Sequence, residues 1–235
     1  LSSLCLAVTG AAAVPVALID KMRNELGFES VVTAYGLTET CGVVTICRAD
    51  DSAELISTTS GRAMPGVEVQ CVSLDGLPVP AGEPGEICVR GYNLMQGYFN
   101  NPEATAETID ADGWLHTGDI GILDKQGYLK ITDRLKDMII SGGFNVYPAE
   151  IENGLANIDG VVQSAVIGIA DERMGEVPKA YIVKAQGSDL DAQQVIDWCR
   201  ANMANYKVPR SVEFIDEMPL NASGKIVKGE LRQRA

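Results

Sequence analysis

The chain has 235 residues, a formal net charge of −13 and a hydrophobic fraction of 46%, which is an ordinary composition for a folded protein. The acidic balance argues against nucleic acid or an anionic membrane surface as the main partner, so an anionic ligand would need local cations. No apolar run approaches the ~20 residues that a transmembrane helix needs, and the length allows one large or two smaller domains.

The first 60 residues carry a strand–helix–strand pattern. The apolar run Leu4–Val8 predicts a buried strand, and Pro15 suits the first turn of a helix. Val31–Tyr35 predicts a second buried strand. This order indicates a parallel α/β layer, in which ligands bind at the carboxyl ends of the strands. Two loops of small residues lie at such ends, Thr9–Ala13 and Tyr35–Thr40.

A small β subdomain is expected next. From about Gly61 the sequence alternates between apolar and polar residues, as in Val67–Cys71 and Glu86–Arg90. Turn clusters such as Asp75-Gly76 separate these runs. The pattern lasts to about Thr132 and predicts a β-barrel-like subdomain.

The remainder of the chain has an α+β pattern, reached through the charged segment Asp133–Asp137. That segment is either a solvated linker or a hinge between domains. Beyond it we expect helices that begin at Pro148, after the capping-box-like Ser188–Asp191 and at Lys228, and strands at Val161–Ile169, Ala180–Val183 and Arg210–Ile215.

Six cysteines and one histidine limit the metal and redox chemistry. No C-x-x-C pair occurs, so a zinc site is not expected. Most cysteines lie in apolar or small-residue runs, as reduced core cysteines do. Reduced cysteines favour the cytosol, and we expect a cytoplasmic protein.

The loop after the second strand could serve a nucleotide. The Tyr35 ring can stack on a base, Thr38 can bond a phosphate oxygen, and Glu39 can hold Mg²⁺ together with phosphate oxygens. An ordinary loop with a capping threonine is the alternative interpretation.

Three further polar residues are candidates. Asp119, after Thr-Gly, can accept two hydroxyl hydrogen bonds from a ribose or can serve a turn. His116 has no nucleophile motif nearby, which favours a structural role over a general base. Lys225 does not belong to a Walker P-loop, because Pro219 replaces the first glycine and Ile226 replaces Ser/Thr. It is a point charge on a glycine-containing loop, or else a solvated surface lysine.

The order of the short motifs is more specific than any one of them. In chain order they are Thr9–Ala12, Tyr35–Thr40, Gly61–Gly66, Gly85–Gly91, Gly97–Tyr98, Thr117–Asp119, Asp133–Asp137, Ser141–Glu152 and Ser223–Lys225. From about Val8 to Lys228 this series resembles the adenylate-forming superfamily. That superfamily includes acyl-CoA synthetases, 4-coumarate–CoA ligases, firefly luciferase and peptide-synthetase adenylation domains.

The resemblance implies a nucleotide site. Enzymes of this family join a carboxylate to AMP, release pyrophosphate and pass the acyl group to a thiol, usually that of coenzyme A. ATP/AMP, Mg²⁺ and coenzyme A are therefore the implied cofactors, and a small carboxylic acid is the implied substrate. The positions that match the family's nucleotide contacts are Gly10, Ala11, Ala12, Tyr35, Gly36, Thr38, Glu39, Asp119 and Arg134, and Glu39 is also the implied metal ligand.

The resemblance also assigns roles after residue 134. Lys225 matches the lysine that bridges the carboxylate and the α-phosphate during adenylation, and it is the implied catalytic residue together with Thr38, Glu39 and Arg134. Lys136 matches the hinge position, where rotation exchanges one face of the small domain for another. The positions that match the lining of the pantetheine tunnel are Ser141, Gly142 and Gly143.

We therefore expect the C-terminal portion of an acyl-CoA synthetase that acts on a fatty acid or related carboxylic acid. The family's phosphate loop is absent, so the 235 residues are expected to be inactive alone. A non-catalytic or regulatory adenylate-binding homologue and a peptide-synthetase-type adenylation domain are the alternatives. The implied domains are 1–133, the C-terminal part of a large AMP-binding domain (α/β piece 1–60, β subdomain 61–133), a hinge at 134–137 and a small mobile domain at 138–235.

Overall fold

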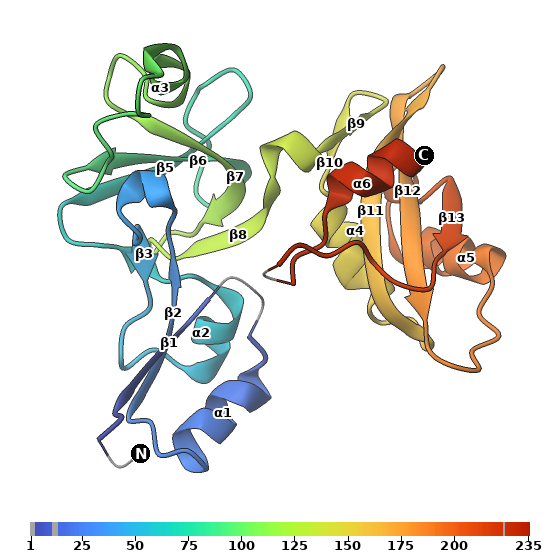
Figure 1. Ribbon diagram of the computed structural model, residues 1–235, viewed down its shortest axis with the longest axis horizontal. Helices are drawn as coiled ribbons and strands as arrows, with labels where there is room; N and C mark the ends of the chain where they lie inside the picture. Colours follow the sequence, from blue (N-terminus) through green and yellow to red (C-terminus); the bar gives the residue numbers. More distant parts are fainter. Residues whose placement is uncertain (1–2, 11–13, 223) are drawn as a thin grey trace. The chain divides into compact units, whose positions relative to one another are not determined.

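The computed structural model describes residues 3–10, 14–222 and 224–235, and the chain divides into two compact units, Leu1–Thr132 and Asp133–Ala235. Both appear in Figure 1, the first coloured blue to green and the second yellow to red. None of the helices in these described ranges combines the length and apolar character that a bilayer crossing requires.

The first unit begins with the predicted parallel layer. Strand β1 (Leu6–Thr9) pairs in parallel with β2 (Ser30–Tyr35), and helix α1 (Val16–Asn24) connects them. Two short strands, β3 (Thr45–Ile46) and β4 (Arg62–Ala63), extend the sheet in the order β1-β2-β3-β4. The core of this layer lies between the sheet and helices α1 and α2 (Ala53–Thr58), and its main members are Ile19, Val31, Val32 and Ile56.

The prediction that the first strand is buried was wrong. Leu6 and Val8 are 55% and 58% exposed, whereas Val31 of β2 is fully buried. Strand β1 is at the edge of its sheet, with β2 as its only paired strand in the described part of the chain. An apolar run at an edge resembles a buried strand in sequence, because composition does not report the strand's position in the sheet.

The predicted β subdomain contains a four-stranded antiparallel sheet in the order β5-β6-β7-β8. Tyr35, the last residue of β2, and Leu37 pack against the core of this sheet, so the end of β2 contacts the second sheet. The strands are β5 (Val67–Val72), β6 (Pro84–Gly91), β7 (Leu115–Leu123) and β8 (Leu129–Arg134), and helix α3 (Pro102–Thr108) lies between β6 and β7.

The second unit is built on a five-stranded sheet in the order β10-β9-β12-β11, with β13 also paired to β12. The predicted strands and helices are present, although Asp191 rather than Ser188 caps the second helix, in a capping box with Gln194. The elements are β9 (Ile139–Ser141), β10 (Phe144–Val146), α4 (Pro148–Leu155), β11 (Val161–Asp171), β12 (Gly175–Lys184), α5 (Ala192–Asn202), β13 (Ser211–Phe214) and α6 (Lys228–Arg234), with 3₁₀ turns at Leu135–Asp137 and Asn205–Lys207.

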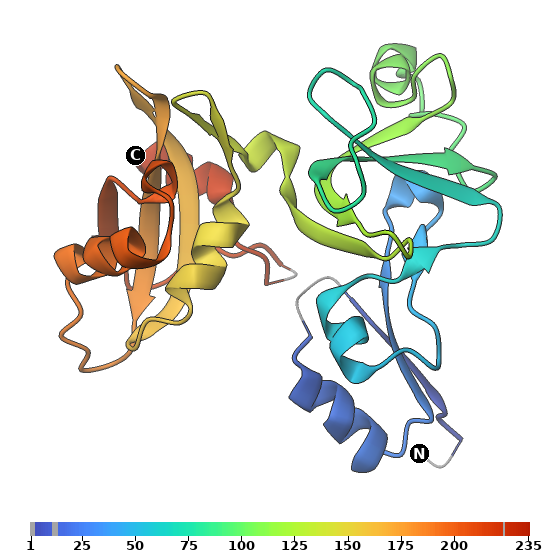
Figure 2. The same cartoon turned by 180° about the vertical axis from the view of Figure 1, so that it is seen from behind.

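Helices cover both faces of this sheet (Figures 1 and 2). Because side chains alternate along a strand, Val166 and Ile182 join one core with α4 and α5, while Ile167 and Tyr181 join another with α6. The fully buried Tyr181 hydroxyl donates to the carbonyl oxygen of Leu231 in α6 at 3.2 Å. The second unit therefore has its own two-sided core.

Candidate functional site

Two of the predicted nucleotide residues meet in the first unit. The hydroxyl of Tyr35, at the end of β2, donates to Oδ2 of Asp119 on β7 at 2.7 Å, although the residues are 84 positions apart. Both side chains are half-buried. The Tyr35 hydroxyl thus holds the Asp119 carboxylate in place. The sequence predicted only that the Tyr35 ring stacks on a base.

A bulge in β7 positions Asp119. Glu86 of β6 pairs with Ile120 and Cys88 pairs with His116, so β7 advances four residues where β6 advances two. Gly118 within the bulge has φ of +69° and donates its N–H to Glu86 Oε1 at 3.0 Å. Bulges re-aim side chains near sites, and this one lies immediately before Asp119.

The predicted Mg²⁺ ligand is held by Tyr98, whose Gly97–Tyr98 motif was noted in the sequence without a role for the tyrosine. Glu39 lies in the 3₁₀ turn Thr38–Thr40, in which Thr38 is exposed and Glu39 is half-buried. The Tyr98 hydroxyl donates to Glu39 Oε1 at 2.8 Å, and this hydrogen bond raises the pKa of Tyr98. The Met95 N–H donates to the Glu39 carbonyl oxygen at 2.8 Å. Only the Gly97–Tyr98 motif could have indicated this contact from sequence.

The two remaining glycines of the predicted nucleotide site allow close backbone approach. A Cβ on Gly36 would collide with the carbonyl of Gly42, so this turn requires glycine. Gly10 follows β1 and is exposed, and a Cβ there would lie 3.2 Å from the Ala34 carbonyl oxygen. Ala11 and Ala12 lie outside the described residues.

The segment predicted as a linker or hinge is fastened within the second unit by its acids. Asp133 accepts the Arg134 N–H through Oδ1 at 2.7 Å and the Ala149 N–H of α4 through Oδ2 at 2.8 Å. Asp137 Oδ1 pairs with Arg232 of α6 at 2.7 Å. The Arg134 and Lys136 side chains are exposed between these anchors. The sequence predicted no partners for these two acids.

The predicted pantetheine turn is a tight hairpin. Ser141 is buried and pairs with Phe144, and Gly142 and Gly143 between them have φ of +58° and +84°. Two consecutive positive φ angles are typical of a type I′ turn, which favours glycine. The Gly142 N–H donates to the Met174 carbonyl oxygen at 2.8 Å, and a Cβ on Gly142 would collide with the Met174 side chain.

Lys225 also lies on a small hairpin, which Leu220 and Ile226 close as a β-bridge. Asn221 shapes the turn: its Oδ1 accepts the Lys225 N–H at 2.9 Å and its N–H donates to the Lys225 carbonyl oxygen at 2.9 Å. Gly224 has φ of +77°. The Lys225 side chain is exposed, so backbone contacts define its position while its ammonium group remains in solvent.

The His116 imidazole lies between two carboxylates. Its Nδ1 lies 2.8 Å from Glu86 Oε2 and its Nε2 lies 3.6 Å from Asp110 Oδ2. Burial, followed by the nearby carboxylates, raises the pKa of the Cys88 thiol beside it to about 12.

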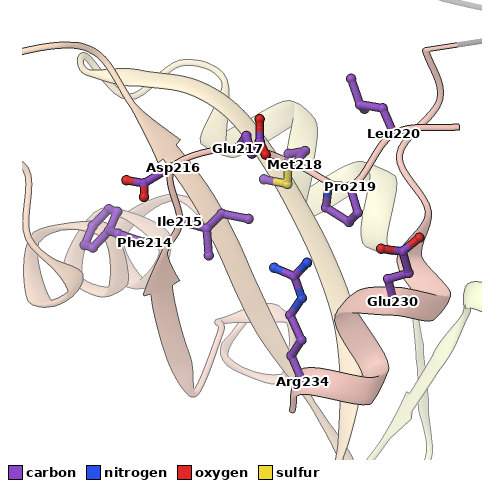
Figure 3. Close-up of a pocket in the computed structure, with 9 residues that line it drawn as sticks. All are labelled: Phe214, Ile215, Asp216, Glu217, Met218, Pro219, Leu220, Glu230 and Arg234. Carbon is purple, nitrogen blue, oxygen red and sulfur yellow. The ribbon is translucent and has the colours of Figure 1, made fainter.

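A hollow of about 770 Å³ in the second unit contains none of the predicted site residues among its lining residues. Figure 3 shows the carboxylates of Asp216, Glu217 and Glu230 and the guanidinium of Arg234 around it. Three acids and one base do not suit an anionic nucleotide. The lining of this hollow therefore does not fit a nucleotide.

Two family models match the chain. Residues 1–99 match the model described as AMP-binding enzyme, and residues 150–225 match the model described as AMP-binding enzyme C-terminal domain.

Curated relatives cover the whole chain. It is 60% identical over 99% of its length to a 3-[(3aS,4S,7aS)-7a-methyl-1,5-dioxo-octahydro-1H-inden-4-yl]propanoyl:CoA ligase from Rhodococcus jostii, and 48% identical over 100% of its length to a feruloyl-CoA synthase from Amycolatopsis. It spans 43% and 47% of those proteins, so it covers less than half of the length of these relatives.

Solved structures agree. ATP-bound MatB from Rhodopseudomonas palustris superposes with a TM-score of 0.87 at 36% identity, over 97% of this chain and 45% of that one. An o-succinylbenzoate CoA synthetase from Bacillus subtilis, in complex with an acyl-adenylate intermediate, gives a TM-score of 0.82 at 36% identity, over 97% of this chain and 46% of that one.

Proposed function

We propose that this chain, which belongs to the adenylate-forming family of AMP-binding enzymes and corresponds to its C-terminal portion, forms part of an acyl-CoA synthetase. The reaction joins a carboxylic acid to AMP and then transfers the acyl group to coenzyme A. The Tyr35–Asp119 hydrogen bond carries the proposal, because it presents an oriented carboxylate beside an aromatic ring. Relatives named as CoA ligases support the choice of thiol.

In the first unit, we assign the nucleotide to the face that carries Tyr35 and Asp119. The Asp119 carboxylate accepts ribose hydroxyls while the Tyr35 hydroxyl keeps it in place, and the Tyr35 ring packs on the base. Thr38 is exposed and donates its hydroxyl to a phosphate oxygen.

Glu39 suits Mg²⁺. Its Oε1 accepts the Tyr98 hydroxyl, and Oε2 has no hydrogen-bond partner among the described residues. Mg²⁺ commonly uses one or two carboxylates and completes its shell with phosphate oxygens and waters. When bound, the ion neutralises phosphate charge. The contribution of this chain is to hold one carboxylate oxygen in a fixed direction.

In the second unit, two turns would serve the two half-reactions. Lys225 supplies a positive charge that offsets the repulsion between the substrate carboxylate and the α-phosphate, and Arg134 contacts the ribose and phosphate. The Ser141–Phe144 turn has no side chains at its tip, so a thin pantetheine arm can pass close to the backbone. Lys136 is the pivot in this proposal, between the anchors at Asp133 and Asp137.

The names of the relatives favour a ring-bearing acid. The relatives at 60% and 52% identity are both named ligases of a fused-ring propanoate, and another is named a feruloyl-CoA synthase. We therefore propose a cyclic or aryl carboxylic acid ahead of a linear fatty acid. The six cysteines are all free thiols, which supports a cytoplasmic location.

The test uses the polypeptide at the length of the relatives. CoA-dependent AMP release is measured over a panel that contains a fused-ring propanoic acid, ferulate and a long-chain fatty acid. Release with the first or second acid supports the proposal. Absence of release with every acid would favour a non-catalytic homologue, and loading of a carrier-protein thiol in place of CoA would favour a peptide-synthetase-type domain.

Lys225→Ala tests the assignment of the lysine. Removal of one preorganised electrostatic contact typically costs about 10²- to 10³-fold in rate. We expect that loss in ATP–pyrophosphate exchange, and little change in thioester formation from preformed acyl-adenylate. Lys125→Ala, at an exposed turn of the first unit, is the matched control and leaves both steps unchanged. Equal loss of both steps in Lys225→Ala would contradict the assigned role.

A further inference from the structure

Three different metal-binding groups converge in the first unit, beside the β7 bulge that positions Asp119. They are the Glu86 carboxylate, the Cys88 thiol and the His116 imidazole, whose donor atoms all lie within 4.8 Å of one another. The Glu86 carboxylate and the Cys88 thiol face the same nitrogen of the His116 ring. Nδ1 of His116 lies 2.8 Å from Glu86 Oε2 and 3.5 Å from Cys88 Sγ.

The two separations from Nδ1 can be compared with what a tetrahedral ion requires. Zinc–ligand bonds of about 2.0–2.3 Å at tetrahedral angles place neighbouring donor atoms about 3.3–3.6 Å apart. The Nδ1–Sγ distance of 3.5 Å already has that value. The Nδ1–Oε2 distance of 2.8 Å has to open by about half an ångström, which a rotation of the Glu86 side chain supplies.

The groups behind these donors are also arranged as in metal sites. Asp110 Oδ2 faces the other ring nitrogen of His116 at 3.6 Å, and Asp110 itself is held through Oδ1 by the backbone N–H groups of Asp112 and Trp114. Glu86 accepts the Gly118 N–H through its other oxygen at 3.0 Å. A metal-bound histidine almost always has a hydrogen-bond acceptor for its second N–H, and a metal-bound carboxylate is usually hydrogen-bonded. The 3.6 Å between Nε2 and Asp110 is an ion-pair distance, which a small movement of either side chain shortens to a hydrogen bond.

We propose that Glu86, Cys88 and His116 bind a divalent transition-metal ion of the zinc class, with Asp110 orienting the imidazole. Sulfur and imidazole nitrogen select Zn²⁺ or Co²⁺ over Mg²⁺ and Ca²⁺, which prefer oxygen ligands. Three protein donors leave a fourth position for water. The ion replaces the thiol proton of Cys88, which leaves to solvent.

The pattern of the sequence could not reveal this site. No C-x-x-C or paired histidine marks it, and Cys88 and His116 are 28 residues apart. The β6–β7 register places those two residues directly opposite each other, and Glu86 lies on the same face of β6 as Cys88. The bulge in β7 then allows Glu86 to reach His116.

The first measurement needs no substitution. His116 is the only histidine, so the imidazole NMR signals of the chain belong to one residue. Addition of Zn²⁺ is expected to shift the Nδ1 resonance as a ligand and the Nε2 resonance as a protonated donor, with saturation at one equivalent. An unchanged imidazole spectrum at several equivalents of Zn²⁺ would overturn the proposal.

The second measurement is a Co²⁺ titration that monitors the thiolate-to-cobalt charge-transfer band. Cys5 and Cys41 are exposed thiols, so both are replaced by serine in the parent protein. We expect one Co²⁺ per chain with this band, displaced by Zn²⁺. Cys88→Ser should abolish the band and His116→Gln should weaken binding at least tenfold.

The matched control is Cys71→Ser. Cys71 is also buried in this sheet, but its neighbour Gln70 pairs with Cys88, so the two thiols point to opposite faces. Cys71→Ser should keep the band, while Asp110→Asn should keep the band and weaken Co²⁺ binding about ten- to hundredfold. A band that survives Cys88→Ser, or is lost equally in Cys71→Ser, would overturn the assignment.

Discussion

The two units of the chain hold their candidate functional residues in different ways. In the first unit, Asp119 and Glu39 each accept a hydrogen bond from a tyrosine hydroxyl that comes from a distant part of the sequence. In the second, Lys225 and Gly142 lie at exposed hairpin turns that backbone hydrogen bonds support. The carboxylates of the first unit are thus oriented by side chains, whereas the groups of the second unit are oriented by the shape of the turn.

The largest effect on stability is expected at the glycine turn of the second unit. Gly142→Ala adds a positive-φ strain of about 1 kcal/mol, and its Cβ also meets the methyl end of the flexible, half-buried Met174 side chain, whose displacement adds up to about 1 kcal/mol. We expect a total loss of about 1–2 kcal/mol. Gly143→Ala, where a Cβ meets nothing within 4 Å, should lose only about 1 kcal/mol.

Urea unfolding monitored by the fluorescence of Trp198, in a Trp114→Phe background, reports on the second unit alone. In a Met174→Ala background the collision is absent. Gly142→Ala should there lower the free energy of unfolding only by the positive-φ strain, when the double variant is compared with Met174→Ala alone. Equal losses in the two glycine variants would show that the Met174 side chain does not support this turn.

The next effect tests the tyrosine anchor of the first unit. Tyr35→Phe keeps the ring but removes the hydroxyl that donates to Asp119, and hydrogen bonds to charged groups contribute about 1.5–3 kcal/mol. The dissociation constant for ATP, measured by calorimetry on the polypeptide at the relatives' length, should rise about ten- to hundredfold.

The matched control for Tyr35→Phe is Tyr128→Phe. Tyr128 donates its hydroxyl to Asp51 at 2.6 Å, so the same chemical change is made at another tyrosine–aspartate pair of the same unit. ATP affinity should not change in this variant. A similar loss in both variants would mean that Tyr35 acts through stability rather than through the orientation of Asp119.

A smaller effect is expected for the second tyrosine anchor, because Tyr98 is 38% exposed. Its hydrogen bond to Glu39 is therefore expected to contribute about 0.5–1.5 kcal/mol. In Tyr98→Phe, the Mg²⁺ concentration for half-maximal AMP formation should rise about three- to tenfold. An unchanged Mg²⁺ requirement would contradict the assignment of Glu39 as a Mg²⁺ ligand.

The smallest effect concerns the turn that supports Gly142. The backbone N–H groups of Met174 and Arg173 donate to the Asp171 carboxylate and hold its pKa below the usual value. Because the folded-state pKa is depressed, the stabilisation is present above the unfolded-state pKa and is lost as the pH falls through the folded-state pKa.

Carboxyl NMR titration of Asp171 measures this directly. Asp171→Asn should remove the pH-dependent contribution while it keeps an acceptor oxygen for the turn, and the change in stability should be small because the group is exposed. A folded-state pKa at or above the usual value for aspartate would contradict the prediction.

Local patterns predicted much of the architecture. The β1–α1–β2 layer, the alternating strands of the first unit and the helix Lys228–Arg234 follow from side-chain periodicity, turn residues and caps, and those signals act within a few residues. The burial of β1 was predicted wrongly, because an apolar strand has the same sequence at the edge of a sheet as at its centre.

The contacts of the candidate site were less accessible from the sequence. The motif series named Tyr35, Glu39 and Asp119, but it did not pair Tyr35 with Asp119 or identify Tyr98 as the partner of Glu39. The support of Gly142 by Met174 was also missed. These contacts join residues at least 32 positions apart, and strand register and bulges determine which of them meet.

The sequence by itself determined the α/β and β patterns of the first unit, the α+β pattern of the second, the family resemblance and the residue types available for chemistry. Motifs and periodicity are local properties of the chain, so they can be identified without the structure. Only the tertiary structure decided which side chains meet. The β6–β7 register places His116 opposite Cys88, and the extra residues in β7 turn Asp119 toward Tyr35 and allow Glu86 to reach His116. A shift of one residue in that register would send each side chain to the opposite face, so the same residues would form neither arrangement.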